Sequence, residues 1–189
     1  MRVYFHELSE DPKSLQFNEK DSWVHQTVQA AQETDVSKSQ HCLVKFVLKK
    51  SHAIIFLKGS AQVSIGLICS RCAASFDFPV HTSFETLYTH QSIYNSNHSH
   101  SDSHGSSYGI AYSEQVFSSE GKKVELEYVE KDYIELADVL KEQIYLQIPY
   151  QPLCKEDCKG ICPTCGQDQN LEPCQCYRIQ KAFGIGIKK

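Results

Sequence analysis

Nine cysteines in a chain of 189 residues are the feature that most restricts what this sequence can fold into. Eight of them form four close pairs, at 69/72, 154/158, 162/165 and 174/176. Six lie in a short stretch after Pro149 that holds too few apolar residues to build a core, so cross-links or metal must hold it together. The N-terminus shows no signal peptide, and cytosolic thiols stay reduced. We therefore expect a cytoplasmic protein whose cysteines bind metal.

The segment Cys162-Pro-Thr-Cys165-Gly166 is the most specific part of the cysteine pattern. Proline rigidifies the turn and glycine permits a positive φ, so backbone amides can point at the sulfurs. Zinc takes four such thiolates tetrahedrally. The three-residue gaps before Cys162 do not match the C-x2-C-x2-C-x3-C-P run of bacterial ferredoxins. The tail is therefore predicted to be a structural zinc module.

Eight thiolates fill two tetrahedral sites, so we expect about two zinc ions per chain. In the preferred pairing, one site is a local ribbon within the tail, with the ligands Cys162, Cys165, Cys174 and Cys176. The other site ties the tail to the rest of the protein, with the ligands Cys69, Cys72, Cys154 and Cys158. A rival pairing groups the four cysteines from 154 to 165 and leaves 174/176 for 69/72. In both schemes each site is closed by four thiolates, which is typical of structural zinc, so we expect no enzymatic activity.

The pair Cys69-Ser-Arg-Cys72 has three interpretations when taken alone: half of a zinc site, a chance pair of buried cysteines, or a redox pair. A thioredoxin-like redox pair needs a βαβ context, whereas both flanks here have the pattern of strands, so a thiol redox switch is the least favoured. Cys42 lies on the apolar face of its strand and is expected to be a small buried hydrophobe. His98, His100 and His104 lie in a polar tract and are expected to be ordinary loop residues.

Four stretches alternate with the period of two expected for half-buried strands; they span residues 42–48, 60–67, 76–85 and 124–128. One-sided alternation indicates an antiparallel sheet with one solvated face. Helices are expected over Ser22–Glu33 and Asp132–Ile148, and Asp132 and Glu135 resemble a capping box. The predicted fold is α+β: an antiparallel β-sheet with two helices and a C-terminal cysteine-rich zinc module.

Composition divides the chain into a sheet domain, residues 1–148, and a zinc-binding tail, residues 149–189, packed on or tethered to the sheet. Within the first part, residues 91–121 are rich in Ser, Asn, His and Gly, and we expect a flexible loop there. No apolar run is long enough to span a bilayer, so no membrane association is expected. No catalytic triad or phosphate-binding loop can be recognised, so no small-molecule substrate is expected.

Charge is unevenly distributed around a formal net charge of −4. Residues 114–142 carry nine acids and four bases, and this acidic region suggests a basic partner that contacts Glu135, Asp138 and Glu142. Two zinc ions on eight thiolates make the net charge about −8. Direct RNA binding would therefore depend on local cations, for which the candidates are Lys155, Lys159, Arg178, Lys181, Lys188 and Lys189.

The order of these features resembles the YceD family, which is named for large ribosomal RNA subunit accumulation. The resemblance rests on Leu67-Ile-Cys-Ser-Arg-Cys72, on a helix reading Ile134-Glu-Leu-Ala-Asp-Val-Leu-Lys-Glu-Gln143, and on Pro149-x-x-Pro-Leu-Cys-Lys-Glu-Asp-Cys-Lys-Gly-Ile-Cys-Pro-Thr-Cys-Gly166. It covers about residues 40–176 and implies a bacterial or plastid protein needed for normal levels of the 23S-type RNA, with no enzymatic activity.

The function expected from this resemblance is that of a ribosome biogenesis factor acting as a zinc-stapled binding platform. Its partner would be a ribosomal protein or an assembly factor of the large subunit. Two alternatives stay open: a zinc-ribbon module that binds large-subunit RNA directly, and, less favoured, a thiol redox switch.

Overall fold

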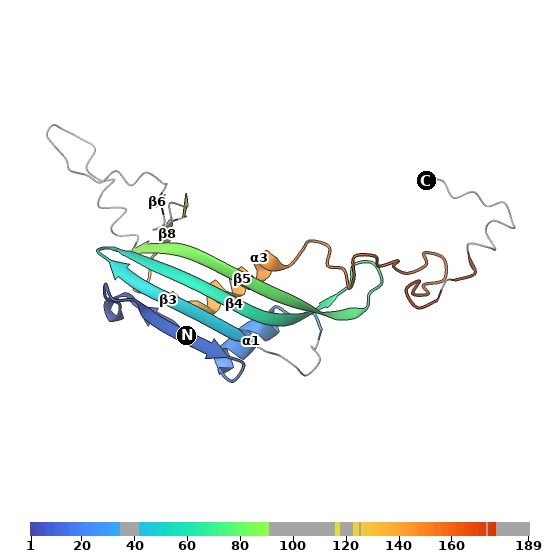
Figure 1. The fold of residues 1–189 in the computed structure, drawn as a ribbon, viewed down its shortest axis with the longest axis horizontal. Helices are drawn as coiled ribbons and strands as arrows, with labels where there is room; N and C mark the ends of the chain where they lie inside the picture. The colour runs from blue at the N-terminus through green and yellow to red at the C-terminus, as the bar shows by residue number, and fades with distance from the viewer. Residues whose placement is uncertain (35–41, 91–115, 118–122, 125, 173, 177–189) are drawn as a thin grey trace, which may run out of the picture.

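The structure is a computed structural model that describes residues 1–34, 42–90, 116–117, 123–124, 126–172 and 174–176 (Figure 1). The strands are β1 (Arg2–Tyr4), β2 (Lys13–Asn18), β3 (Leu43–Ser51), β4 (Ile54–Ile68), β5 (Ser75–His90), β6 (Val116–Phe117), β7 (Lys123–Val124), β8 (Leu126–Val129) and β9 (Tyr133–Glu135). The α-helices are α1 (Ser22–Ala30) and α3 (Leu136–Gln147), and a 3-10 turn covers Phe5–Glu7. The described residues thus form an α+β protein.

The main sheet has the strand order β2-β3-β4-β5-β8. The pairings from β2 to β5 are antiparallel, whereas β8 lies parallel to the last four residues of β5. The prediction of a purely antiparallel sheet is therefore wrong at this edge. A parallel neighbour requires a crossover connection, which the long segment between His90 and Leu126 provides. Two further pairs, β1 with β9 and β6 with β7, are antiparallel.

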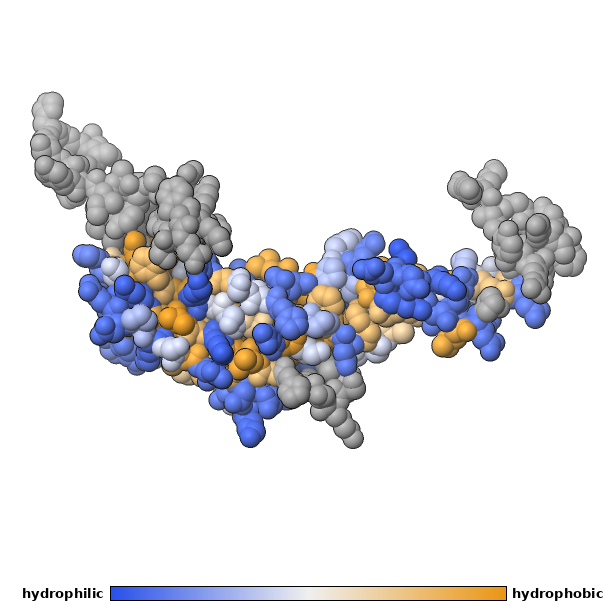
Figure 2. All heavy atoms as spheres, in the orientation of Figure 1, coloured by the Kyte–Doolittle hydropathy of each residue, from blue (hydrophilic) through white to orange (hydrophobic). Residues whose placement is uncertain are grey.

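Both helices lie against one face of the main sheet and leave the other face free of helices (Figure 1). From the sheet, Val44, Phe46 and Leu48 point into the core, and in α3 Leu136, Leu140 and Ile144 are fully buried. Burial of one such side chain contributes about 1.5–3 kcal/mol. The helix-free face, turned to the viewer in Figure 2, mixes hydrophilic and hydrophobic residues, because the exposed positions of the strands alternate with the buried ones.

The four predicted strands overlap observed ones, but their bounds differ. The second extends from Ile54 to Ile68 and the third from Ser75 to His90. The fourth is divided between β7, which pairs with β6, and β8, which joins the main sheet. The sequence analysis missed β1, β2, β6 and β9: β1, β6 and β9 have only two or three residues each, and β2 is recognisable only through its pairing with β3.

The predicted helix bounds need two corrections. The first helix ends at Ala30, and the backbone N–H groups of Glu33 and Thr34 donate instead to the carbonyl oxygen of Gly66, at 2.9 and 3.4 Å. The second helix begins at Leu136, and the capping box at Asp132 is wrong because Tyr133–Glu135 forms β9. Pairing with β1 satisfies this backbone, so helical hydrogen bonds start later.

The expected flexible loop at 91–121 falls outside the described residues, except for Val116–Phe117 in β6. The histidines at 98, 100 and 104 fall outside them as well. Among the described residues, no helix combines the length and apolar character needed to cross a membrane.

Candidate metal centre

The turn between β4 and β5 presents the first cysteine pair. These two strands pair along their whole length, from Ile54 opposite Thr89 to Ile68 opposite Ser75, and the turn that joins them, residues 69–74, is called the knuckle here. The backbone N–H of Cys69 donates to the carbonyl of Ala74, and that of Ala73 donates to the carbonyl of Cys69, both at 2.9 Å. This tight turn directs the thiols of Cys69 and Cys72 to one side.

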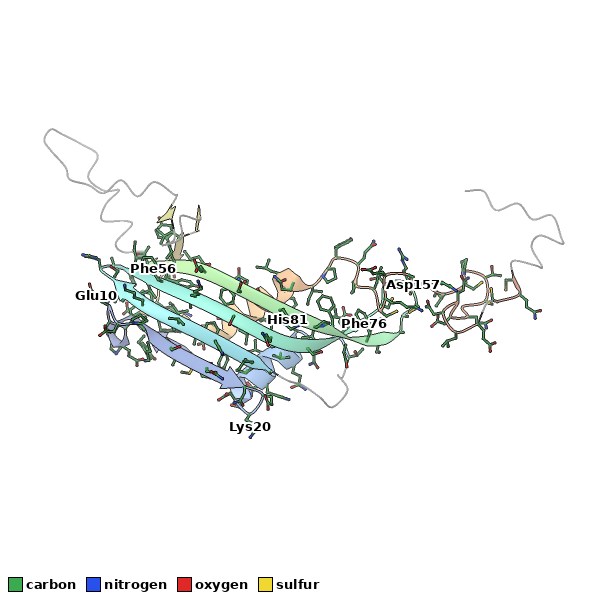
Figure 3. All side chains as sticks on the ribbon, in the orientation of Figure 1. Glu10, Lys20, Phe56, Phe76, His81 and Asp157 are labelled. Atoms are coloured by element: carbon green, nitrogen blue, oxygen red, sulfur yellow. The ribbon has the colours of Figure 1, made fainter. Side chains whose placement is uncertain are left out.

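The C-terminal tail is fastened to the knuckle by backbone hydrogen bonds. The N–H of Ser70 donates to the carbonyl of Pro152 at 2.8 Å, and the N–H of Ile161 donates to the carbonyl of Arg71 at 3.1 Å. Gly160 has a φ of +74°, and a Cβ there would lie 3.0 Å from the Arg71 carbonyl oxygen, so glycine is required. In Figure 3 the tail, with Asp157, lies beyond the end of the sheet that carries Phe76.

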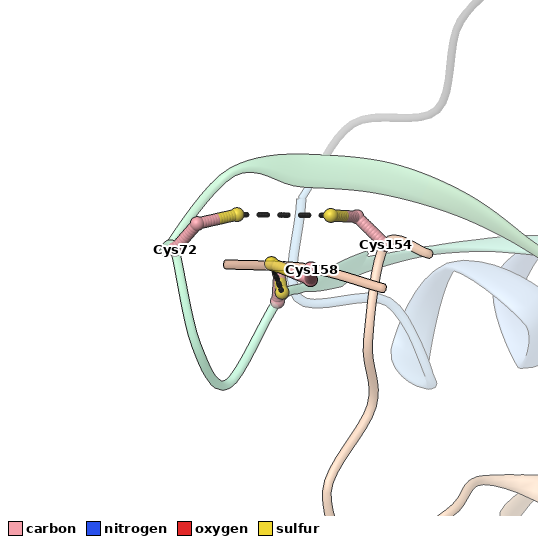
Figure 4. A group of neighbouring side chains, drawn as sticks. Cys72, Cys154 and Cys158 are labelled. Carbon is pink, nitrogen blue, oxygen red and sulfur yellow. Dashed lines mark hydrogen bonds between the residues drawn. The ribbon is translucent and has the colours of Figure 1, made fainter. Parts of the chain in front are cut away.

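The four sulfurs at this junction form the sheet tetrad, defined as Cys69, Cys72, Cys154 and Cys158. Their Sγ atoms all lie within 4.8 Å of one another. The Sγ atoms of Cys69 and Cys158, and those of Cys72 and Cys154, are 3.7 Å apart (Figure 4). A tetrahedral ion with bonds of about 2.3 Å places its sulfurs about 3.8 Å apart, whereas a disulfide requires about 2.05 Å. The geometry therefore fits one tetrahedral ion.

The surroundings of the sheet tetrad favour a bound cation. Cys69 and Cys158 are 2 % and 3 % exposed, and Phe76 and Leu153 pack against the cluster. Burial raises the pKa of Cys69, but hydrogen bonds from the backbone of Cys154, Cys72 and Arg71 outweigh it and bring the pKa to about 6. Burial raises the pKa of Cys154 to about 12. Crowded thiols cannot all ionise alone, so four thiolates here need a positive ion among them.

The remaining four paired cysteines form the tail tetrad, defined as Cys162, Cys165, Cys174 and Cys176. Their Sγ atoms also lie within 4.8 Å of one another. The N–H of Gly166 donates to the carbonyl of Cys162 at 2.8 Å, with a φ of +73° at the glycine. Backbone hydrogen bonds from Cys165 and Thr164 lower the pKa of Cys162 to about 6. Cys165 is exposed, so this tetrad is more open to solvent than the first.

The structure therefore groups the eight cysteines as the preferred pairing predicted, and the rival pairing is wrong. Cys154 and Cys158 cannot join the tail tetrad because the knuckle holds them beside Cys69 and Cys72. Cys42 is buried away from both tetrads, as predicted, and burial raises the pKa of its thiol to about 11.

The acidic candidates line a groove formed by β8, β9 and α3. Asp138 and Glu142 line a groove of about 330 Å³, together with Tyr88, Glu127 and Glu130. Glu135 also lines it, but its carboxylate is bound by the N-terminal ammonium group and, at 3.0 Å, by Arg2 Nε. Burial and then the charges of Glu127 and Glu142 raise the pKa of Tyr88.

Sequence reasoning missed several residues at these sites. Glu127 and Glu130 belong to the acidic region but were not singled out as candidates. Arg71 donates from its guanidinium group to the carbonyl oxygen of Cys158 at 3.0 Å, and Asn170 donates to the Sγ of the same residue at 3.4 Å. Neither carries a signal in the sequence, because these contacts join distant segments. Of the basic candidates, Lys155 and Lys159 are exposed beside the sheet tetrad. Arg178, Lys181, Lys188 and Lys189 fall outside the described residues.

These features define a class of protein: an α+β domain in which a hairpin turn and a C-terminal tail share a four-cysteine cluster that could hold a metal ion, and the tail carries a second one. The chain belongs to the YceD family, described as large ribosomal RNA subunit accumulation protein YceD, whose profile matches residues 57–183. The matched region contains all eight tetrad cysteines. The resemblance inferred from the motifs is thereby confirmed.

Curated relatives are similar over parts of their length. An uncharacterized protein of Mycobacterium tuberculosis is 30% identical over 64 residues, which cover 34% of this chain and 31% of that protein. A second relative, from Arabidopsis thaliana, is named large ribosomal RNA subunit accumulation protein YCED homolog 1, chloroplastic. It is 23% identical to this chain over 141 residues, and the match covers 69% of this chain and 42% of the relative. The chain therefore spans less than half of the length of these relatives. No solved structure matches the chain.

Proposed function

We propose that this protein is a ribosome biogenesis factor that supports accumulation of the 23S-type RNA and acts as a zinc-stapled platform without enzymatic activity. The family name supports the role in RNA accumulation. The platform is supported by one observation above all: the sheet tetrad takes two sulfurs from the β4–β5 turn and two from the tail. The protein would act where the large subunit is assembled, in a bacterial cytoplasm or a chloroplast.

Zinc is the metal that we propose for both tetrads. Four sulfurs within 4.8 Å suit one thiophilic ion and leave no space for the bridging sulfides of an iron–sulfur cluster. Four thiolates close the coordination sphere, so the ion would supply a structural cross-link and no reactive vacancy. Cys69 and Cys72 each lie 3.7 Å from a sulfur of the tail, Cys158 and Cys154 respectively, so they would act as two of four ligands and not as an isolated redox pair.

Elemental analysis of protein purified without chelator tests the metal assignment. We expect about two zinc ions per chain. Replacement of Cys69 or of Cys154 with Ser should remove the same single ion, while Cys42→Ala should remove none. One ion per chain in the unmodified protein, or iron in place of zinc, would show that the two-site zinc scheme is wrong.

For the partner, we propose a basic segment of a ribosomal protein or assembly factor that binds the acidic groove. Glu130, Asp138 and Glu142 are exposed and form no ion pair with other described residues. Val129 and Val139 line the same groove and provide apolar contact for the stems of Lys or Arg side chains. Because Glu135 is already neutralised by Arg2, it would shape the groove more than attract the partner.

Direct RNA binding is the second candidate function, and the exposure of Lys155 and Lys159 beside the sheet tetrad supports it. With Arg178, Lys181, Lys188 and Lys189, these residues would give the tail a local positive charge on an acidic protein. Affinity for RNA would then fall steeply with salt, because bound phosphates release their counterions.

Rescue of cells depleted of the protein separates the two candidates. Depletion should lower the large-subunit RNA relative to the small-subunit RNA, and an unchanged ratio would exclude the assembly role. Asp138→Lys with Glu142→Lys should abolish rescue at normal zinc content. Glu10→Lys with Asp11→Lys, an equal charge change at exposed positions elsewhere, should preserve it.

Neutralisation of the basic residues from 178 to 189 should matter less than reversal of the groove charges. The opposite ranking, with the tail essential and the groove dispensable, would favour direct RNA contact. Binding of the pure protein to large-subunit RNA at several salt concentrations would then give a steep negative slope.

A further inference from the structure

One side chain, that of Asn170, links the two tetrads. Asn170 lies in the loop between Cys165 and Cys174, both members of the tail tetrad. Its Nδ2 nevertheless donates a hydrogen bond to the Sγ of Cys158, at 3.4 Å, and Cys158 belongs to the sheet tetrad. A residue carried by one cluster therefore contacts a sulfur of the other.

The amide of Asn170 is held in a single orientation. Its Oδ1 accepts a hydrogen bond from the backbone N–H of Lys159 at 2.9 Å, and its Nδ2 also donates to Oδ1 of Asp168 at 2.7 Å. A flipped amide would turn its oxygen towards the Asp168 carboxylate and the Cys158 sulfur, and its NH₂ group towards the N–H of Lys159. Only the observed orientation pairs every donor with an acceptor, so an N–H group always faces the sulfur.

The position of Asn170 depends on the tail loop. The N–H of Gln169 donates to the carbonyl of Gly160 at 2.9 Å, and Asp168 pairs with Ile161 in an isolated bridge. The loop that carries Asn170 begins at Cys165 and ends at Cys174. Loss of metal from the tail tetrad would therefore release both ends of the loop that places Asn170 on Cys158.

We propose that Asn170 is a positioning residue through which an occupied tail tetrad slows the loss of metal from the sheet tetrad. The proposal rests on the metal binding included in the proposed function. Four thiolates on a divalent ion leave excess negative charge, and an N–H donor to one sulfur reduces it. Outer partners of metal ligands typically change affinity by 10- to 100-fold. The two sites would then lose metal in order, first the tail tetrad, which is more open to solvent.

Zinc release to the chromogenic chelator 4-(2-pyridylazo)resorcinol tests this coupling in the full-length, zinc-loaded chain. Asn170→Ala should speed release from the sheet tetrad about 10-fold. Gln167→Ala, an exposed position in the same loop, should leave both release phases unchanged. A variant with Ser at Cys174 and Cys176 identifies the sheet-tetrad phase and should release its ion as fast as Asn170→Ala.

Adding Asn170→Ala to the tail-tetrad variant should accelerate release no further, because the contact is already lost. Additive effects, or release from Asn170→Ala at the unmodified rate, would overturn the coupling while leaving two-zinc binding intact. Unmodified protein without zinc would instead overturn the proposed function. The two failures are thus distinguishable.

Cobalt-loaded protein distinguishes a hydrogen bond to sulfur from a purely structural role. Asn170→Asp keeps the shape of the side chain but removes the N–H donor, and a change in the sulfur-to-cobalt charge-transfer band is expected in this variant and in Asn170→Ala. The band should be unchanged in Gln167→Ala. Identical bands in all three variants would show that Asn170 acts only by supporting the loop, and the proposal would be wrong.

Discussion

Removal of the metal from the sheet tetrad should free residues 149–161 while the sheet stays folded. Ordering these 13 residues costs about 13 kcal/mol even at about 1 kcal/mol per residue. Three hydrogen bonds to the knuckle and the burial of part of Leu153 offset this cost by only about 5 kcal/mol of stabilising free energy. The deficit of about 8 kcal/mol is close to the lower end of the 10–16 kcal/mol or so that structural zinc supplies. Without metal, the segment should therefore detach.

Limited trypsin digestion followed by mass spectrometry checks this. In Cys154→Ser, or after treatment with a chelator, cleavage after the exposed Lys155 and Lys159 should become fast. The strands from β3 to β5 should stay resistant, because their core is formed by α1 and α3 and not by the tail. Cys42→Ala provides the control, since it removes a buried thiol outside both tetrads.

Two results would refute the reasoning. Equal cleavage at Lys155 with and without metal would show that packing alone holds the tail. Loss of the whole folded structure in Cys154→Ser would show that the sheet depends on the metal, contrary to the separate core described above.

Three further changes have calculable effects on stability, each measurable by urea denaturation. Gly66→Ala should destabilise by about 1–3 kcal/mol, because the new Cβ would lie 2.3 Å from the carbonyl oxygen of Thr34; an unchanged midpoint would mean that the chain after α1 moves freely. Leu140→Ala, at a fully buried position of α3, should cost about 2–5 kcal/mol, and a smaller loss would place α3 outside the core. The N-terminal ammonium group and Arg2 lower the pKa of Glu135 from its ordinary 4.5, so their contribution is present above about pH 4.5 and lost as the pH falls through the lowered value. Glu135→Gln should therefore be less stable than the unmodified protein at about pH 7, and the difference should shrink as the pH falls through the lowered pKa; a difference that does not change with pH would exclude this ion pair as the cause.

The parts of the fold that could be predicted from the sequence are those with a local signal. Alternation over Val44, Phe46 and Leu48 identifies a strand because one face of it is buried. The cysteine pairs at 162/165 and 69/72 predict turns that bring sulfurs together. Four pairs predict two sites of four sulfurs, but only the structure shows which pairs share a site. In each case a few neighbouring residues determine the geometry.

The features that could not be predicted depend on distant partners. Tyr133–Glu135 resembles the start of a helix in the sequence. It forms a strand instead, because it pairs with β1, more than a hundred residues earlier in the chain. β8 pairs in parallel with β5 because of the direction in which the chain comes back to the edge of the sheet. No pattern in the residues of β8 itself predicts that direction. Asn170 is likewise an ordinary loop residue until Cys158 is placed beside it.

The division of the sheet tetrad between a hairpin turn and the tail also has a consequence for the order of synthesis. Cys69 and Cys72 leave the ribosome with the β4–β5 hairpin, but Cys158 is made about 86 residues after Cys72, some 4–17 s later at ordinary elongation rates. During that interval the nascent chain carries two thiols without their partners. The cluster can close only when the tail has emerged, so its closure marks a chain that has been translated at least as far as Cys158.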